Sequence, residues 1–367
     1  MEKPTILILG GCGFIGRNLV AYLVSNNLVK FVRIVDKVPP QVAWLNSAHQ
    51  EVFNNPIIEY KSANLINLDS CKNAFSPSSE VHTWDYVINC AGETKPAQTD
   101  PVYKEGILKL SLNCANQAAL HKAKRYIEIS SGQMFNADKV AHKEDDAIKP
   151  WTFIAKWKRQ VETELEQIPD LRYTIVRPAI TYGLGDKAGL MPRLMVAAIY
   201  KQLGETMKLL WSSDLKLSTV HVNDICRAIW FLCRRDDTVG QIYNVADDAE
   251  STQGSICGLL TDILDVKVDY YGNLVSSAVD LTAAADDAND KHLKPWAEAC
   301  RKDAVQNTPL SPHMDYEILL PKNLHLDCSK IKKLGFEVSI PKPTVENLQE
   351  IVRDYVDMKV FPNSLAS

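Results

Sequence analysis

The sequence predicts a doubly wound α/β fold, a parallel sheet with helices on both faces, followed by a smaller C-terminal α+β lobe. Two observations support this class. Short apolar runs alternate with amphipathic segments through the first half of the chain, and a glycine-rich turn joins the first run to the first helical segment. Residues 1–180 are assigned to the sheet domain, to which 216–245 are expected to return. Residues 181–215 and 246–367 are assigned to the smaller, substrate-binding lobe.

The first predicted strand ends in a glycine cluster with the spacing of a phosphate-binding turn. Gly10 lets the backbone turn sharply, Gly13 leaves room for a pyrophosphate beside the main chain, and Gly16 lets the helix pack closely on the strand. The N–H groups of Phe14 and Ile15, at the start of that helix, then face an anion. This pattern indicates a Rossmann-type dinucleotide site.

The second predicted strand ends in Asp36, 20 residues after Gly16. A carboxylate at this position accepts hydrogen bonds from the ribose hydroxyls of adenosine. The expected cofactor is therefore NAD, because Asp36 would repel the 2′-phosphate of NADP. Lys37 follows directly and offsets part of this repulsion, which leaves NADP open.

Two further strand ends are expected along the cofactor. Asn64 and Leu65 follow the third strand, where they would lie beside the adenine ring. Cys90, Ala91 and Gly92 end the fourth strand, and small residues there suit a dinucleotide that lies close to the sheet. A tight turn also explains Ala91 and Gly92, and both interpretations can hold together.

The fifth strand ends in Ser130 and Ser131, where a substrate is expected, although serines in this position also form ordinary turns. The sixth strand ends at Pro178, where the chain is expected to leave the sheet abruptly. Pro178 is also predicted to be a cofactor-binding residue. Residues 273–324 are predicted to be an irregular insertion with a short helix near Trp296.

The composition excludes several classes of function. With 46% hydrophobic and 23% charged residues and a formal net charge of −4, the chain shows no basic surface for nucleic acid or anionic membranes. It also lacks an apolar run of the roughly 20 residues that a membrane span needs. The nine cysteines are scattered without a C-x-x-C pair, and the eight histidines lack metal-ligand spacing. We therefore expect a cytoplasmic protein without a metal, and a homodimer or a protein complex stays open.

Taken together, these motifs resemble the extended short-chain dehydrogenases/reductases of the NAD-dependent epimerase/dehydratase type. The resemblance implies hydride transfer between NAD(P) and a hydroxyl or carbonyl group of a small-molecule substrate, usually a nucleotide-linked sugar and in some relatives a steroid or flavonoid. The matching pieces, in family order, are Gly10–Gly16, Asp36, Val87–Gly92, Tyr126–Ser131, Arg177-Pro178 with Tyr182-Gly183, His221–Asp224, Tyr243–Val245, and Leu326-Asp327 with Leu334–Phe336.

The family's chemistry, as the resemblance implies it, uses a Tyr-x-x-x-Lys helix. The tyrosine removes or returns a hydroxyl proton, while the lysine holds the nicotinamide ribose and lowers the tyrosine pKa. Ser131 matches the hydroxyl residue that completes this set. No tyrosine lies between Phe135 and Arg172, however, and Gly106 stands where the family has an asparagine.

Two registers of the catalytic helix are open. The family's glutamate lies four residues after its lysine, so Glu162 favours Lys158 as that lysine and places Ile154 at the tyrosine position. A register on Lys156 places Thr152 there instead. Neither side chain replaces a phenol, because isoleucine carries no acidic proton and an alkyl alcohol is far too weak an acid near neutral pH.

Two functions follow from this departure. One is an oxidoreductase or isomerase with another acid/base, for which Ser131 with a relayed water, Glu93, Lys95 and His142 are candidates. The other is a catalytically inactive dinucleotide-binding protein that serves as a subunit, sensor or scaffold. The intact nucleotide motif beside the missing tyrosine supports the second function.

Overall fold

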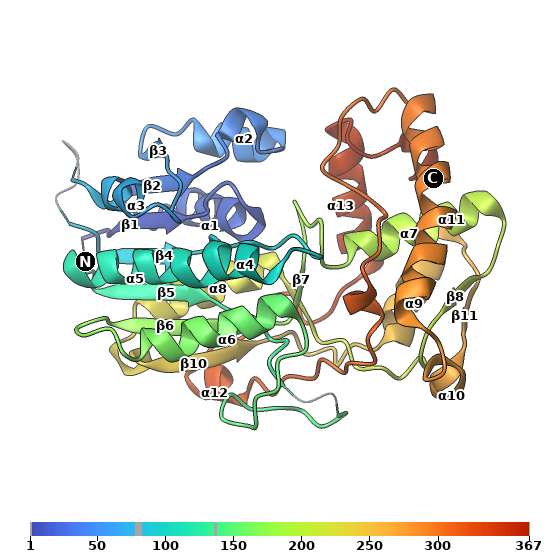
Figure 1. The fold of residues 1–367 in the computed structure, drawn as a ribbon. Coiled ribbons are helices and arrows are strands. Elements are labelled where there is room, and N and C mark those ends of the chain that lie inside the picture. The colour runs from blue at the N-terminus through green and yellow to red at the C-terminus, as the bar shows by residue number, and fades with distance from the viewer. Residues whose placement is uncertain (1, 78–82, 136–137, 367) are drawn as a thin grey trace.

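The computed structural model describes residues 2–77, 83–135 and 138–366. Its central sheet is parallel, with the strand order β10-β6-β5-β4-β1-β2-β3 (Figure 1). The direction of winding reverses between β1 and β4, and ligands of such sheets bind at that reversal, outside the carboxyl ends of the strands. The strands are β1 (Thr5–Leu9), β2 (Phe31–Asp36), β3 (Ile58–Ser62), β4 (Tyr86–Asn89), β5 (Arg125–Ile129), β6 (Tyr173–Pro178) and β10 (Gln241–Val245).

Helices cover both faces of this sheet, which confirms the predicted fold class. Alternate residues of β1 serve the two layers: Ile6 and Ile8 belong to one apolar cluster, and Leu7 and Leu9 belong to the other. Because both faces are buried, the strand is a continuous apolar run. The first layer contains α1 (Phe14–Ser25) and α8 (Val222–Cys233), and the second contains α3 (Leu68–Phe75), α5 (Leu110–Leu120) and α6 (Phe153–Leu165).

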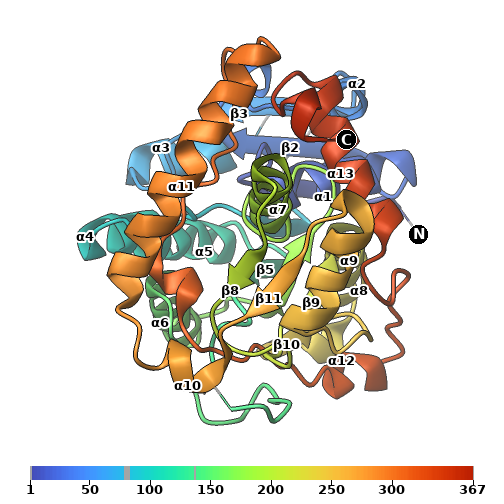
Figure 2. The same cartoon turned by 90° about the vertical axis from the view of Figure 1, so that its right-hand side faces the viewer.

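A second apolar core lies beside the sheet domain, on the right of Figure 1 and facing the viewer in Figure 2. Four helices share it: α7 (Met191–Leu203), α9 (Gln253–Leu264), α11 (Leu281–Lys302) and α13 (Val345–Asp357). Two small parallel sheets accompany it, β8 (Met207–Leu209) with β11 (Val268–Tyr270) and β7 (Ile180–Tyr182) with β9 (Thr219–His221). The other helical elements are α2 (Ser47–Phe53), α4 (Asp100–Tyr103), α10 (Gly272–Ser276), α12 (Ser329–Lys333), the π-helical η2 (Lys104–Lys109), and the 3-10 turns η1 (Pro40–Val42), η3 (Asp236–Thr238), η4 (Tyr316–Leu319) and η5 (Asn363–Leu365).

The prediction of an irregular insertion with a short helix is wrong over much of its length. Helix α11 runs for 22 residues, and the Asp280 carboxylate caps it by accepting hydrogen bonds from the Thr282 and Ala283 N–H groups. A proline in a helix interior normally breaks or kinks the helix, but Pro295 lies inside this one. The alanine-rich first half and the burial of Trp296 against the second core outweigh that single breaker.

In the described part of the chain, no helix has both the length and the apolar character that crossing a bilayer requires. All nine cysteines are free thiols.

Candidate active site

The glycine turn after β1 is packed against the end of β4. Gly10 has φ of +74°, and a Cβ atom there would lie 2.6 Å from the Ala91 nitrogen. A Cβ atom at Gly16 would lie 2.3 Å from the Gly10 carbonyl oxygen. Neither position accepts a side chain unless backbone atoms move, so these two glycines fix the shape of the turn.

Gly13 differs from the other two glycines because it is exposed and precedes α1 in an ordinary extended conformation. A Cβ atom there would lie 3.1 Å from the Gly10 oxygen, which is only a mild contact. Helix α1 has no side-chain cap and no acidic residue in its first turn. The N–H groups of Phe14 and Ile15 donate to no described group, so the helix start can receive an anion.

Asp36 ends β2 with its carboxylate against the glycine turn. Its Oδ2 accepts a hydrogen bond from the Cys12 N–H at 3.0 Å, and its Oδ1 accepts one from the Val38 N–H at 3.0 Å. Burial raises the pKa of Asp36, and these N–H bonds together with the Lys37 charge oppose that rise. The carboxylate therefore lies where the turn and β2 meet, while Lys37 is exposed.

The loop after β3 is held in place from α5. Asn64 is exposed and Leu65 is buried. The Asn113 side chain donates to the carbonyl oxygens of Leu65 and Ile66, each at 3.0 Å. Sequence reasoning missed Asn113, because nothing in its local pattern shows which loop it reaches.

Arg17 is a second residue that sequence reasoning missed. Its guanidinium is buried and donates to the carbonyl oxygens of Cys12, Ala43 and Trp44, each at 2.6 Å. It therefore ties the glycine turn to the segment that follows η1. Burial lowers the pKa of Arg17. The sequence did contain one signal for this role: Arg17 directly follows Gly16, on the side of α1 that packs closely.

Lys158 reaches from α6 to the end of β4. Its side chain is 8% exposed, and its Nζ lies 3.6 Å from where a Cβ atom of Gly92 would be. The Lys156 side chain is 62% exposed, with its Nζ 3.8 Å from a carboxylate oxygen of Asp100. The geometry therefore favours the register in which Lys158 faces the strand ends. Burial raises the pKa of neighbouring Cys90 to about 12, so its thiol is protonated at neutral pH.

The tyrosine position of this register holds hydrocarbon. Ile154 lies in the first turn of α6, half-buried and packed against the apolar layer of that face. Thr152 caps the helix instead: its Oγ1 accepts from the Ala155 N–H and donates to Gln133 Oε1, both at 3.1 Å. Neither residue offers a proton-transfer group to a substrate.

The two serines at the end of β5 have different environments. Ser130 is buried and donates to Glu162 Oε1 at 2.6 Å, and Arg177 binds the same carboxylate through two bonds of 2.9 and 2.7 Å. Ser131 is half-buried, and among the described residues its Oγ accepts one hydrogen bond, from the Gln133 N–H at 3.1 Å. Of the two hydroxyls, that of Ser131 is therefore the one open to a ligand.

Pro178 supports the loop that carries Ser131. It is half-buried, and its carbonyl oxygen accepts the Gly132 N–H at 2.9 Å. A Cβ atom at Gly132 would lie 2.7 Å from that oxygen, so the chain passes close to Pro178 at this point.

The other acid/base candidates are Glu93, Lys95 and His142, and Glu93 and His142 already have hydrogen-bond or ion-pair partners within the chain. Glu93 lies against Gly106 in the π-helical turn η2, and its carboxylate accepts the Lys95 N–H at 2.9 Å. The Lys95 side chain is exposed. His142 is buried with its Nε2 2.8 Å from Asp138 and its Nδ1 3.4 Å from Asp146, so carboxylates face both ring nitrogens.

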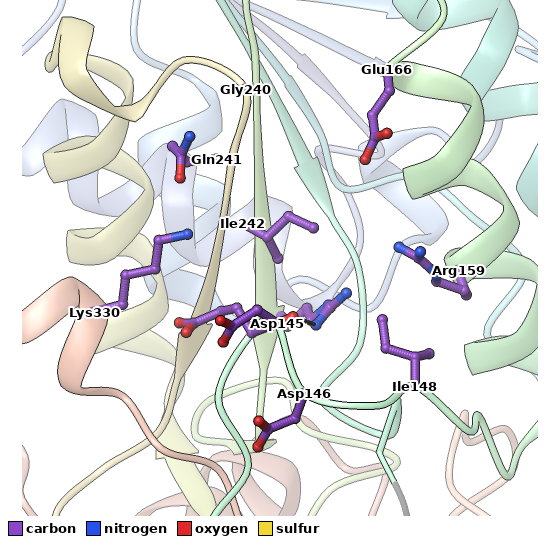
Figure 3. Close-up of a pocket in the computed structure, with 11 residues that line it drawn as sticks. Asp145, Asp146, Ile148, Arg159, Glu166, Gly240, Gln241, Ile242 and Lys330 are labelled. Atoms are coloured by element: carbon purple, nitrogen blue, oxygen red, sulfur yellow. Dashed lines mark hydrogen bonds between the residues drawn. The ribbon is translucent and has the colours of Figure 1, made fainter.

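A separate pocket of about 470 Å³ lies at the β6–β10 edge of the sheet (Figure 3). In this view Lys330 and Arg159 flank Ile242. Because four acidic and three basic side chains line it, it shows no preference for a ligand of either charge. None of the predicted cofactor residues is among its lining residues: Glu144, Asp145, Asp146, Ile148, Arg159, Glu166, Arg177, Gly240, Gln241, Ile242 and Lys330. The described residues contain no cluster of three or more His, Cys, Asp or Glu side chains suited to a metal ion.

Similar proteins agree with this architecture. A dTDP-glucose 4,6-dehydratase from Haemophilus influenzae is 23% identical over 302 residues, which cover 75% of this chain and 86% of that protein. A Streptomyces venezuelae dTDP-glucose 4,6-dehydratase solved with bound NAD superposes with a TM-score of 0.69 at 18% identity, over 96% of this chain and 97% of the other. A Thermotoga maritima UDP-glucose 4-epimerase solved with UDP-glucose gives 0.66 at 19% identity, over 96% and 99%.

A sequence model of the NAD dependent epimerase/dehydratase family matches residues 6–246, which include the glycine turn, Asp36, Ser131 and Lys158. This match spans more than half of the chain and all of the central sheet except Thr5. The chain therefore belongs to the NAD-dependent epimerase/dehydratase family.

Proposed function

We propose that this protein binds NAD along the carboxyl ends of β1, β2 and β4. The observation that carries the proposal is the uncapped start of α1 behind Gly13, beside two glycines that admit no side chain. The residues fit the cofactor: the N–H groups of α1 suit a pyrophosphate, and Asp36 suits a ribose diol. Bound NAD would supply a hydride acceptor, or in its reduced form a hydride donor.

We assign substrate binding to the lobe built on α7, α9, α11 and α13. The related dehydratase and epimerase structures carry nucleotide or nucleotide-sugar ligands by their descriptions, which supports a nucleotide-linked sugar as the ligand class here. Ser131 would face such a ligand from the end of β5, because its hydroxyl accepts a single hydrogen bond from the part of the chain that the structure describes.

The environment of Ile154 favours binding over rapid turnover. A hydroxyl group oxidised by NAD must lose a proton, and Ile154 offers no group to accept it. General acid/base assistance contributes typically about 10² to 10⁴-fold, so its loss leaves slow chemistry at best. We therefore favour a binding role, as a sensor, subunit or scaffold.

Slow hydride transfer is the second candidate. Ser131 keeps an accessible hydroxyl, and Lys158 lies beside Gly92 at the end of β4. A water held by Ser131 could then carry the proton that a tyrosine carries elsewhere in the family.

Two measurements on the purified protein separate these candidates. Calorimetric titration with NAD and with NADH tests binding, and absence of heat with either would refute the proposal. Absorbance of the reduced nicotinamide and chromatography of the sugar products, both followed over hours with UDP- and dTDP-linked sugars, test net oxidation and redox-neutral turnover. A signal that Ser131→Ala removes would favour slow chemistry, whereas binding without any signal would favour the sensor or scaffold role.

A further inference from the structure

A buried carboxylate, Glu128, lies near the carboxyl end of β5, beside Lys158. Its side chain is 0% exposed. Apart from Arg125 at the start of the strand, the other residues of β5 are apolar or aromatic, as expected for a buried strand. Burying a carboxylate is costly unless it is paired and hydrogen-bonded. We therefore expect the Glu128 carboxylate to be paired with a cation and hydrogen-bonded, and the structure shows both.

Four donors surround the Glu128 carboxylate. Its Oε1 accepts from Lys158 Nζ and Ser111 Oγ, both at 3.0 Å, and its Oε2 accepts from Asn89 Nδ2 and the Tyr126 hydroxyl, both at 2.7 Å. A carboxylate has about four acceptor sites, so Glu128 is saturated. It has no capacity left to accept a hydrogen bond from a substrate.

Lys158, by contrast, is not saturated. Of the three N–H bonds of its ammonium group, one is directed to Glu128, and the other two have no acceptor among the described residues. The same ammonium lies beside Gly92, at the surface where the cofactor is proposed to pass. Lys158 can therefore donate hydrogen bonds to a ribose while the Glu128 carboxylate balances its charge.

The network also reaches the end of β4. The Asn89 side chain that donates to Glu128 accepts the Ala91 N–H at 3.1 Å through its Oδ1. Glu128 thus fixes both the lysine and the strand end against which the glycine turn packs.

We propose that Glu128 is a positioning residue that holds the Lys158 ammonium at the cofactor groove and cancels its positive field there. The inference rests on the proposed NAD site. It means that the groove near the nicotinamide carries no net charge from this pair, so the cationic ring of NAD⁺ and the neutral ring of NADH are bound with similar affinity.

The test is the ratio of the dissociation constants of NAD⁺ and NADH, measured by calorimetry at pH 6.5. Glu128→Gln leaves a lone positive charge near the ring, so NAD⁺ should weaken relative to NADH by about tenfold. Lys158→Met leaves a lone negative charge, so the ratio should move about tenfold in the opposite direction. Glu105→Gln is the matched control, because this surface glutamate pairs with Lys109 on a helix and should leave the ratio unchanged.

The outcomes distinguish the two proposals. A merely structural role for Glu128 would weaken both forms of the cofactor alike, so an unchanged ratio in Glu128→Gln and Lys158→Met would overturn the inference while NAD binding stands. Binding of neither form by the unmodified protein would overturn the proposed function, and the inference with it. Shifts of the same sign in both variants would also refute charge cancellation.

Discussion

Replacing Gly13 by valine should abolish NAD binding without unfolding the protein. The backbone of Gly13 has φ of −70°, which any residue adopts, and its Cβ position lies 3.1 Å from the Gly10 oxygen. A contact this close requires a shift of a few tenths of an ångström, so the expected loss of stability is about 1 kcal/mol. The new side chain would occupy the exposed surface in front of the α1 N–H groups.

The loss of affinity follows from the hydrogen bonds at the start of α1. Bonds from N–H groups to a charged phosphate contribute roughly 1.5–3 kcal/mol each. Excluding the phosphate from the Phe14 and Ile15 N–H groups should therefore weaken NAD by at least about 100-fold. Calorimetric titration measures this change, and thermal unfolding checks the fold.

Two matched variants complete the experiment. Gly16→Val introduces a Cβ atom 2.3 Å from a backbone oxygen, so it should lose stability by several kcal/mol along with binding. Gly258→Val lies on an exposed part of α9 where no atom comes within 4 Å of the new Cβ, so it should change neither property. Unaltered NAD affinity in Gly13→Val would refute the assignment of the phosphate to this turn.

The remaining predictions concern other parts of the chain. Calorimetry should show tighter binding of NAD(H) than of NADP(H), with the difference removed by Asp36→Ala; equal affinities in the unmodified protein would contradict this. Ile154→Tyr should create or raise turnover measured at the nicotinamide band, because it places a phenol one helical turn before Lys158. Inactivity of this variant on every alcohol and nucleotide sugar tested would favour the binding-only role. Arg177→Met leaves the fully buried Glu162 carboxylate without its two-bond partner, so urea denaturation should show a loss of about 3–5 kcal/mol, and a loss below about 1 kcal/mol would be inconsistent with that pairing. Burial lowers the pKa of His49 to about 4, so the unfolded chain takes up a proton below about pH 6.5 that the folded chain does not. Stability should therefore fall by up to about 3 kcal/mol as the pH drops from about 6.5 to 4, and His49→Phe should remove that part of the slope in unfolding measured at several pH values; an identical slope in the variant would count against the shift.

The sequence predicted the sheet and the glycine turn because both depend on local requirements. A turn that packs Gly10 onto the next strand end tolerates no Cβ atom, and such a requirement is visible as a glycine. The apolar runs of the parallel strands are equally local, since burial on two faces demands them. Helix α11 was missed for the opposite reason: a local breaker, Pro295, was outweighed by burial against a core that the sequence does not display.

Neighbouring serines show where pattern alone is insufficient. Ser130 and Ser131 are chemically identical and adjacent, but they follow the last residue of β5 and their side chains have different surroundings. One hydroxyl is therefore taken by the Glu162 carboxylate, and the other is left half-exposed. Family resemblance selected Ser131 from the pair, and only the packing shows what binds Ser130.

Two features of the candidate active site concern the same lysine: the missing phenol one turn before Lys158, and its buried partner Glu128. Elsewhere in the family the resemblance places an acidic phenol beside the lysine, whereas here the side chain one turn before Lys158 is Ile154. Glu162, four residues further along α6, is already bonded to Ser130 and Arg177. Lys158, only 8% exposed and next to hydrocarbon on its own helix, therefore needs a counter-charge from another element. Glu128, from β5, supplies that counter-charge at 3.0 Å. The missing phenol and the buried Lys158–Glu128 pair therefore belong to one electrostatic arrangement, in which the lysine still reaches the groove but its positive charge is balanced by Glu128.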